Sequence, residues 1–190
     1  MPFLLVNDLQ TIERDAVFQR QVPYPSLDEK VNIIKNSVEV ANACGVVVPK
    51  VAVLASVEVV NPKMPCTVEA AELTRMCDEG VIKNCIVDGP LSFDLATNPE
   101  AALHKSATAR KIVGDADILI FPDIHAGNIT YKCMSHMVPH RSGCILAGTL
   151  APTILTSRSD DMETKVNSIA LAAVVAQHKK EKVYNNNAYN

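Results

Sequence analysis

The sequence predicts an α/β fold, and two observations predict it. From about residue 27, short apolar runs alternate with segments whose apolar residues recur at helical spacing. The runs, such as Val51–Ala55 and Ile118–Phe121, are apolar throughout instead of alternating with polar residues. Strands of this kind lie in parallel sheets that helices cover on both faces. We therefore expect a three-layer α/β/α domain with a doubly wound, mostly parallel sheet.

The first three helices are predicted from the residues at their ends. Ser26 precedes an apolar periodic segment and Glu29 lies three residues later, which is a capping-box pattern. Gly45 is placed to end that helix. A second helix is expected from Thr67 to Cys77, followed by Gly80, and a third begins at Asn98-Pro99, because proline favours the first helical position.

The remaining elements are predicted from apolar runs and the residues that interrupt them. Cys85–Val87 is the second strand, and we expect Asp88, Gly89 and Pro90 to break it. The third strand ends at Pro122, and Asn128 is expected to cap a helix from Ile129 to Met137. Two further strands at 144–147 and 154–155 precede a long helix over about 160–177.

Length and composition indicate one globular domain. The chain has 190 residues, of which 48% are hydrophobic. Its net charge is −3 and its basic residues are dispersed, so nothing indicates nucleic-acid binding. No apolar run reaches the ~20 residues that cross a bilayer, and the N-terminus lacks the pattern of a signal peptide. We expect a cytoplasmic protein with an N-terminal extension over 1–25, an α/β domain over 26–178 and a flexible polar tail over 179–190.

The six cysteines contain no Cys-x-x-Cys pair and lie mostly in apolar surroundings. Reduced core thiols are therefore expected. They are Cys44, Cys66, Cys77, Cys85, Cys133 and Cys144.

Polar residues follow four of the predicted strands. The loops carry Asn61 after the first strand, Asp88 after the second, Asp123 with Gly127 and Asn128 after the third, and Ser157 after the last. Because the carboxyl ends of parallel strands share one edge, these loops are expected to converge on a single cleft. The alternative is that each is an ordinary turn, since Gly and Asn are common turn residues.

The last of these loops, Thr156–Asp160, has the composition of an anion site. Arg158 offers a planar set of donors that matches a phosphate or carboxylate. Ser157 adds a hydroxyl, and the following helix adds the positive end of its dipole. The alternative is a helix N-cap supplied by Ser159 or Asp160 beside a solvated arginine.

The histidines permit a competing hypothesis of a metal-dependent hydrolase. His136 and His140 are four residues apart and His125 lies nearby. However, Pro139 interrupts the helix between the pair, and structural zinc sites need four well-placed ligands. We therefore expect no metal. The sequence also contains no Gly-x-Gly-x-x-Gly or Walker pattern.

Several motifs together resemble the phosphate acetyl/butyryltransferase family, and most closely its phosphate butyryltransferase branch. The resemblance covers about residues 27–177. Its segments are Lys50–Glu58, Val60–Met64, Cys85–Leu91, Gly114–Leu119, Pro122-Asp123, Ala126–Asn128, Tyr131-Lys132 and Leu155–Asp160.

The resemblance implies a doubly wound fold of the isocitrate/isopropylmalate dehydrogenase type and a reversible acyl transfer between acyl-CoA and inorganic phosphate. Coenzyme A thioester is then a substrate, and no cofactor is expected. Ser157, Arg158 and Asp160 are the candidate catalytic residues: Ser157 would hydrogen-bond oxygens that become charged, and Arg158 would hold an anionic group. The candidate substrate-binding residues are Asn61, Asp88, Gly89, Pro90, Asp123, Gly127, Asn128 and Lys132.

The chain departs from the family pattern in two ways. Family members carry a substantial N-terminal portion that forms the other wall of the cleft, and residues 1–21 do not resemble it. His125 also stands where the butyryl branch commonly has an acidic residue. The alternative function is therefore a truncated paralogue or fragment that binds CoA-like ligands or a partner subunit. The resemblance further implies a homo-oligomer, a dimer or larger.

Overall fold

The computed structural model describes residues 4–6, 23–105, 107, 109–158 and 160–188. Its main sheet has the order β1–β4–β2–β3, and every pair in it is parallel. The strands are β1 (Leu4–Val6), β2 (Lys50–Leu54), β3 (Ile86–Leu91) and β4 (Ile118–Ile120). The prediction of an α/β fold with a parallel sheet is confirmed.

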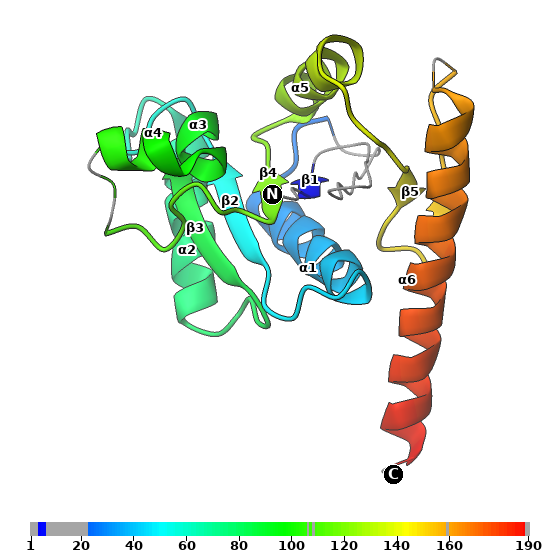
Figure 1. The fold of residues 1–190 in the computed structure, drawn as a ribbon. Helices are drawn as coiled ribbons and strands as arrows, with labels where there is room; N and C mark the ends of the chain where they lie inside the picture. The colour runs from blue at the N-terminus through cyan, green and yellow to red at the C-terminus, as the bar shows by residue number, and fades with distance from the viewer. Residues whose placement is uncertain (1–3, 7–22, 106, 108, 159, 189–190) are drawn as a thin grey trace.

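Helices pack on both faces of this sheet (Figure 1). Val51 and Val53 of β2 lie in one core with α1 (Leu27–Ala43) and α2 (Pro65–Asp78). Ala52 and Leu54 lie in a second core with α3 (Phe93–Thr97) and α4 (Pro99–His104). Because successive strand residues point to opposite faces, a strand that is apolar throughout supplies both cores.

The predicted ends are confirmed for the first and third helices that the sequence indicated, whereas the second begins at Pro65, before the predicted Thr67. Glu29 accepts a hydrogen bond from the Ser26 backbone at 2.8 Å, and the Ser26 hydroxyl accepts one from the Glu29 backbone at 3.4 Å. Gly45, just beyond α1, has a φ of +93°. Asn98 caps α4 by accepting a bond from the Glu100 backbone at 2.9 Å.

The prediction that Asp88, Gly89 and Pro90 break the second strand was wrong. β3 continues through all three to Leu91, and Asp88 is buried. The Asp88 carboxylate accepts backbone hydrogen bonds from Lys111 at 2.9 Å and Ile112 at 3.2 Å, and it pairs with Arg110 at 2.9 Å. These partners, more than twenty residues away, allow a charged residue inside a strand.

The helix after β4 begins earlier than the sequence predicted. α5 spans Ile124–Met137, and its N-cap is Asp123, whose side chain accepts a bond from the Ala126 backbone at 2.9 Å. The expectation of an Asn128 cap was therefore wrong. Asn128 lies inside the helix, where it is exposed.

The C-terminal part forms a second sheet instead of extending the parallel sheet. β5 (Ile145–Leu146) and β6 (Thr153–Ile154) pair antiparallel in a two-stranded sheet beside α6 (Met162–Ala188) (Figure 1). The connection 147–152 is too short for a parallel crossover, which needs about a dozen residues. The helix was expected to end near residue 177, and it continues past that point to Ala188.

Side chains of α6 tie it to the rest of the fold. Lys179 donates to the Thr149 carbonyl at 2.9 Å and pairs with Glu39 of α1 at 3.2 Å. Leu171 and Val175 complete the core that α1 and α2 share. Residues 179–188 belong to α6, whereas the sequence predicted a flexible tail there.

Two further predictions concern cysteines and membranes. Of the six cysteines, only Cys144 is buried, whereas Cys44 and Cys133 are exposed. The prediction that they are mainly core residues was wrong. Within the described ranges, the helices lack the length and apolar character that a membrane span requires.

Candidate active site

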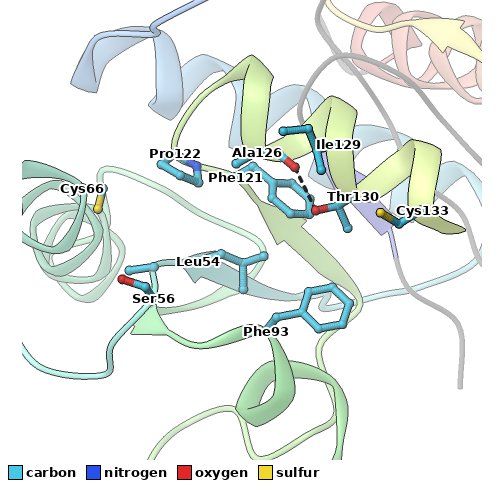
Figure 2. A pocket seen from close by; sticks show the side chains of 11 residues that line it. Leu54, Ser56, Cys66, Phe93, Phe121, Pro122, Ala126, Ile129, Thr130 and Cys133 are labelled. Carbon is cyan, nitrogen blue, oxygen red and sulfur yellow. Dashed lines mark hydrogen bonds between the residues drawn. The ribbon is translucent and has the colours of Figure 1, made fainter.

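A cavity of about 570 Å³ opens at the carboxyl ends of β2 and β4 (Figure 2). This is the edge at which open α/β sheets bind ligands. The cavity, hereafter the apolar cavity, lies between the end of β2, the starts of α2 and α3, and one face of α5. Its lining consists of Leu54, Ala55, Ser56, Cys66, Phe93, Phe121, Pro122, Ala126, Ile129, Thr130 and Cys133.

The wall that α5 contributes has a simple periodicity. Its four lining residues are Ala126, Ile129, Thr130 and Cys133, at positions i, i+3, i+4 and i+7 of one helical face. The Thr130 hydroxyl donates to the Ala126 carbonyl at 2.8 Å, so its polar group is occupied within the helix (Figure 2). Sequence reasoning missed this face because it began the helix at Ile129.

The predicted turn residues lie next to the cavity without lining it. Asp123 caps α5, and Gly127 is buried in the first turns of the helix. Lys132 lies over the Tyr131 ring, with its ammonium 4.9 Å from the ring centre. Asn61 forms the turn before α2: its side chain accepts from the Lys63 backbone at 3.0 Å, and its own backbone N–H donates to Thr67 at 2.9 Å.

The Asp160 carboxylate accepts hydrogen bonds from two directions. The Ser157 backbone N–H donates to Asp160 Oδ2 at 2.5 Å, and the Tyr131 hydroxyl donates to Asp160 Oδ1 at 3.2 Å. Burial raises the pKa of Tyr131 above its usual range, so this hydroxyl stays a donor. Arg158 is exposed in the turn. Ser159, the other suggested cap, lies outside the described residues.

The predicted convergence of four strand ends is therefore correct only in part. The ends of β2 and β4 meet at the apolar cavity. The loop 157–160 follows the antiparallel β6 and joins this region through the contact between Tyr131 and Asp160. Asp88 and its two successors lie inside β3, where Gly89 packs against Val53 and Ala70 and the Pro90 carbonyl accepts from Arg110 at 2.9 Å.

A charged network beside the cavity links the ends of β2 and β3. Lys105 donates to Glu58 at 2.6 Å, to Ser92 at 2.9 Å and to Asp94 at 3.0 Å, and Ser92 also donates to Glu58. The Lys105 ammonium and the Ser92 hydroxyl lower the pKa of Glu58. Sequence reasoning missed Ser92 and Lys105, because their shared partner is remote in the chain.

Two histidines of the metal hypothesis contact groups outside the proposed ligand set. His125 Nε2 lies 2.8 Å from the Tyr24 hydroxyl, and His140 Nδ1 lies 3.2 Å from the Val138 carbonyl oxygen. In the described part of the chain, no three His, Cys, Asp or Glu side chains are grouped to bind a metal ion. The geometry therefore gives no support to a hydrolase site at His125, His136 and His140.

Known proteins resemble this chain in sequence and in structure. It is 53% identical to the phosphate butyryltransferase of Clostridium acetobutylicum over 156 residues, which are 82% of this chain and 52% of that protein. It is 49% identical to the phosphate acetyltransferase of Thermotoga maritima over 80% of this chain and 51% of that protein. The chain thus spans about half the length of these curated relatives.

A solved structure gives the same result. The branched-chain phosphotransacylase of Enterococcus faecalis V583 superposes with a TM-score of 0.79 at 36% identity, covering 90% of this chain and 62% of that chain. The family model described as "Phosphate acetyl/butaryl transferase" matches residues 8–173, which begins earlier than the predicted resemblance. With that match over most of its length, the chain belongs to the phosphate acetyl/butyryltransferase family.

Proposed function

We propose that this chain carries the acyl-transfer site of a phosphate acyltransferase. In the proposed reaction, a phosphate oxygen attacks the thioester carbonyl carbon of an acyl-CoA. The carbon–sulfur bond then breaks, the acyl phosphate leaves, and the CoA thiolate takes up a proton. The observation that carries this proposal is the loop 157–160, held against α5 by Asp160, in a chain 53% identical to a phosphate butyryltransferase.

The loop residues have chemistry that suits the charge that develops in this reaction. Negative charge grows on the carbonyl oxygen as phosphate attacks, and preorganised donors stabilise it. We assign this role to the Ser157 hydroxyl. Arg158 is exposed and offers a planar set of donors, which suits binding of phosphate or of an anionic group of CoA.

Asp160 is the positioning residue of this arrangement. Its two carboxylate oxygens accept bonds from the Ser157 backbone and the Tyr131 hydroxyl, so it connects the loop to α5. Holding two reactants in one geometry accounts for much of the rate in reactions without a covalent enzyme intermediate. As proposed, the reaction uses no cofactor, since both reacting groups belong to the substrates.

The substrate-binding roles of the other predicted residues remain proposals. Asp123, Gly127, Asn128 and Lys132 lie on or directly before α5, the helix that lines the apolar cavity and contacts Asp160, and we propose that they bind substrate. For Asn61, Asp88, Gly89 and Pro90 we propose a supporting role, because their polar groups bond to the protein itself.

The test is thiol release from butyryl-CoA in the presence of inorganic phosphate. Arg158→Ala is expected to lower kcat/KM for phosphate by roughly 100-fold, the size of effect seen when one preorganised donor is removed. The matched control is Arg141→Ala, because Arg141 is also exposed and pairs with Glu163 on the surface of α6 at 3.1 Å. Turnover that is equal in the two variants contradicts the role of Arg158.

The same assay separates the leading proposal from its alternative. Acyl-CoA-dependent formation of acyl phosphate supports the enzyme. If calorimetry detects CoA binding and no acyl phosphate forms at any phosphate concentration, the chain is a binding protein of the same family instead.

Three finer expectations also remain proposals. We propose the doubly wound arrangement of the isocitrate/isopropylmalate dehydrogenase type, supported by helices on both sheet faces. A homo-oligomer is supported by exposed apolar side chains on α6, among them Val166, Ile169 and Val183. A cytoplasmic location is proposed because acyl-CoA and phosphate are metabolites of that compartment.

A further inference from the structure

We propose that Cys77 and Cys85 are a redox-active thiol pair, which a low-molecular-weight disulfide oxidises to a disulfide bond between the end of α2 and the start of β3. Neither residue lines the apolar cavity or belongs to the loop 157–160. The proposal therefore concerns a modification site that acyl transfer does not use, and its test does not depend on turnover.

The two thiols are in contact with each other. The Cys77 thiol donates to the Cys85 carbonyl oxygen at 3.5 Å, and the Cys85 thiol has the Cys77 side chain as a hydrogen-bond partner. Both side chains are half-buried and pack against the core that α1 and α2 share. Thiols in such contact are close enough for one to attack a disulfide that has formed on the other.

The backbone between the two cysteines fixes this contact. Gly80, just after α2, has a φ of +78°, which glycine adopts without strain. Its N–H donates to the Cys77 carbonyl at 3.0 Å, and the Val81 N–H donates to the Met76 carbonyl at 2.8 Å. The chain thus turns directly after the helix, and β3 begins immediately after Cys85.

The two cysteines have different roles in the reaction. Burial, with a further contribution from the neighbouring Cys77 thiol, raises the pKa of the Cys85 thiol. Because only the thiolate is a nucleophile, we assign the first attack to Cys77 and the second to Cys85. Once Cys77 has reacted, its thiol no longer helps to raise the pKa of Cys85, and this favours the second step.

Two thiol–disulfide exchanges give the cross-link. The Cys77 thiolate attacks one sulfur of the small disulfide, whose sulfur–sulfur bond breaks, and the released thiolate takes up the proton that Cys77 lost. The Cys85 thiol then loses its proton and attacks the Cys77 sulfur of the mixed disulfide, and the second small thiolate leaves and takes up that proton. The two cysteines are oxidised, and the small disulfide is reduced to two thiols. The second exchange is intramolecular, so the contact between the cysteines accelerates it.

The cross-link would join α2 to β3 at the edge of the sheet opposite the apolar cavity. Cys85 directly precedes β3, whereas the cavity lies at the carboxyl ends of the parallel strands. Cys66, near the start of α2, lines that cavity, so this helix reaches from one edge of the sheet toward the other. A disulfide restricts the unfolded chain over residues 77–85, and the oxidised form is therefore expected to resist urea better than the reduced form.

Oxidised glutathione tests the pair in the full chain. After incubation, iodoacetamide blocks the remaining thiols, and mass spectrometry identifies the tryptic peptides. Trypsin cuts after Arg75 and Lys83, so Cys77 and Cys85 lie in different peptides, 76–83 and 84–105. The proposed disulfide therefore joins two peptides that are otherwise separate.

The expected result is a link between Cys77 and Cys85 that is about tenfold more abundant than any other link between two cysteines, because contact makes the second exchange fast. Cys44 and Cys133 are exposed and serve as controls, which should stop at the mixed disulfide with glutathione. If these two are modified and the link between Cys77 and Cys85 does not dominate, the proposal is overturned.

Two serine variants test the order of attack. Cys85→Ser should accumulate the mixed disulfide on Cys77, because the second thiol is missing. Cys77→Ser should form a mixed disulfide on Cys85 about tenfold more slowly, because burial keeps that thiol protonated. Equal rates in the two variants contradict the assigned order. Oxidation should also raise the urea midpoint of the parent chain and not that of Cys85→Ser, and an equal rise in both contradicts the cross-link.

Discussion

The two sides of α5 are organised in different ways. On one side, the apolar cavity has walls from β2, β4 and α3, which belong to a core with Leu91, Leu95 and Leu119. On the other side, the loop 157–160 follows a two-stranded hairpin and is held by hydrogen bonds to one carboxylate. The cavity thus depends on the packing of several elements, whereas hydrogen bonds of Asp160 join the loop to α5.

This difference separates stability from chemistry. Changes on the sheet side of α5 should mainly alter the free energy of unfolding, because each side chain there packs against several others in the core. Changes at the loop should alter turnover first, because the Asp160 carboxylate joins Ser157 to Tyr131 of α5. The following predictions test that division.

The largest effect is expected from a matched pair of glycines. Gly114 and Gly148 have nearly the same φ, +84° and +82°, so alanine meets the same backbone strain at each. A Cβ at Gly114 would overlap the backbone of Asn98 and Pro99 on the sheet side, whereas at Gly148 it would meet the Asn36 side chain. Gly114→Ala is expected to cost about 4 kcal/mol of unfolding free energy, and Gly148→Ala about 1 kcal/mol.

Urea denaturation of the two variants measures both costs. The control is a double variant that carries Gly148→Ala and Asn36→Ala. Because alanine at position 36 lacks the atoms that the new Cβ would meet, the contact between the two side chains should no longer contribute to the cost of Gly148→Ala. Equal costs at Gly114 and Gly148 would show that backbone strain dominates and that the two regions are equally tolerant of added volume.

A smaller effect is expected from the tyrosine that joins α5 to the loop. Tyr131→Phe removes the donor to Asp160 and is expected to lower kcat about tenfold, the equivalent of ~1.4 kcal/mol for a bond to a charged group. Tyr24→Phe removes a hydroxyl that contacts His125 instead. It should leave kcat within about twofold of the parent chain.

Steady-state kinetics and urea denaturation of both tyrosine variants decide this prediction. A fall in kcat without a comparable fall in stability supports the positioning role of the Asp160 contact. If Tyr131→Phe unfolds more easily and retains full kcat, the contact is structural only.

The smallest effects concern pH. The backbone N–H of Thr164 lowers the pKa of Asp161 on the α6 side, and Lys105 with Ser92 lowers that of Glu58 beside the cavity. A lowered carboxyl pKa contributes stability above its unfolded value near pH 4, and this stability is lost as pH falls through the folded value.

Asp161→Ala is therefore expected to lower the free energy of unfolding by about 1 kcal/mol at pH 7, because a helix cap is lost. Lys105→Met is expected to lower it by less than ~1 kcal/mol, because the ion pair that is lost is exposed. Both costs should shrink toward zero by about pH 3. Urea midpoints at the two pH values measure them. A cost that is unchanged at low pH would assign the effect to packing instead of charge.

Local patterns were sufficient for the elements whose causes are local. The capping box of Ser26 and Glu29, the stop at Gly45 and the Asn98-Pro99 helix start all involve residues within four positions of one another. The doubly apolar strands also predicted cores on both faces of the sheet. The motif at Ser157 and Arg158 was recognised because its residues are consecutive.

The errors arose where the deciding partner is distant in the chain. Asp88 was read as a strand breaker because nothing near it indicates Arg110 and the backbone of Ile112. Asp123 and Asn128 are both good caps, and the choice between them depended on where α5 meets the end of β4.

The sequence was enough for the class of fold, the order of its elements and the residues with suitable chemistry, because periodicity and capping act over a few residues. Which of those residues meet was settled by packing between segments far apart in the chain. β5 and β6 pair antiparallel outside the parallel sheet because the connection between them is short. Tyr131 contacts Asp160 because α5 lies beside the residues that follow β6. The apolar cavity exists only in the folded chain, since its walls come from four separate segments.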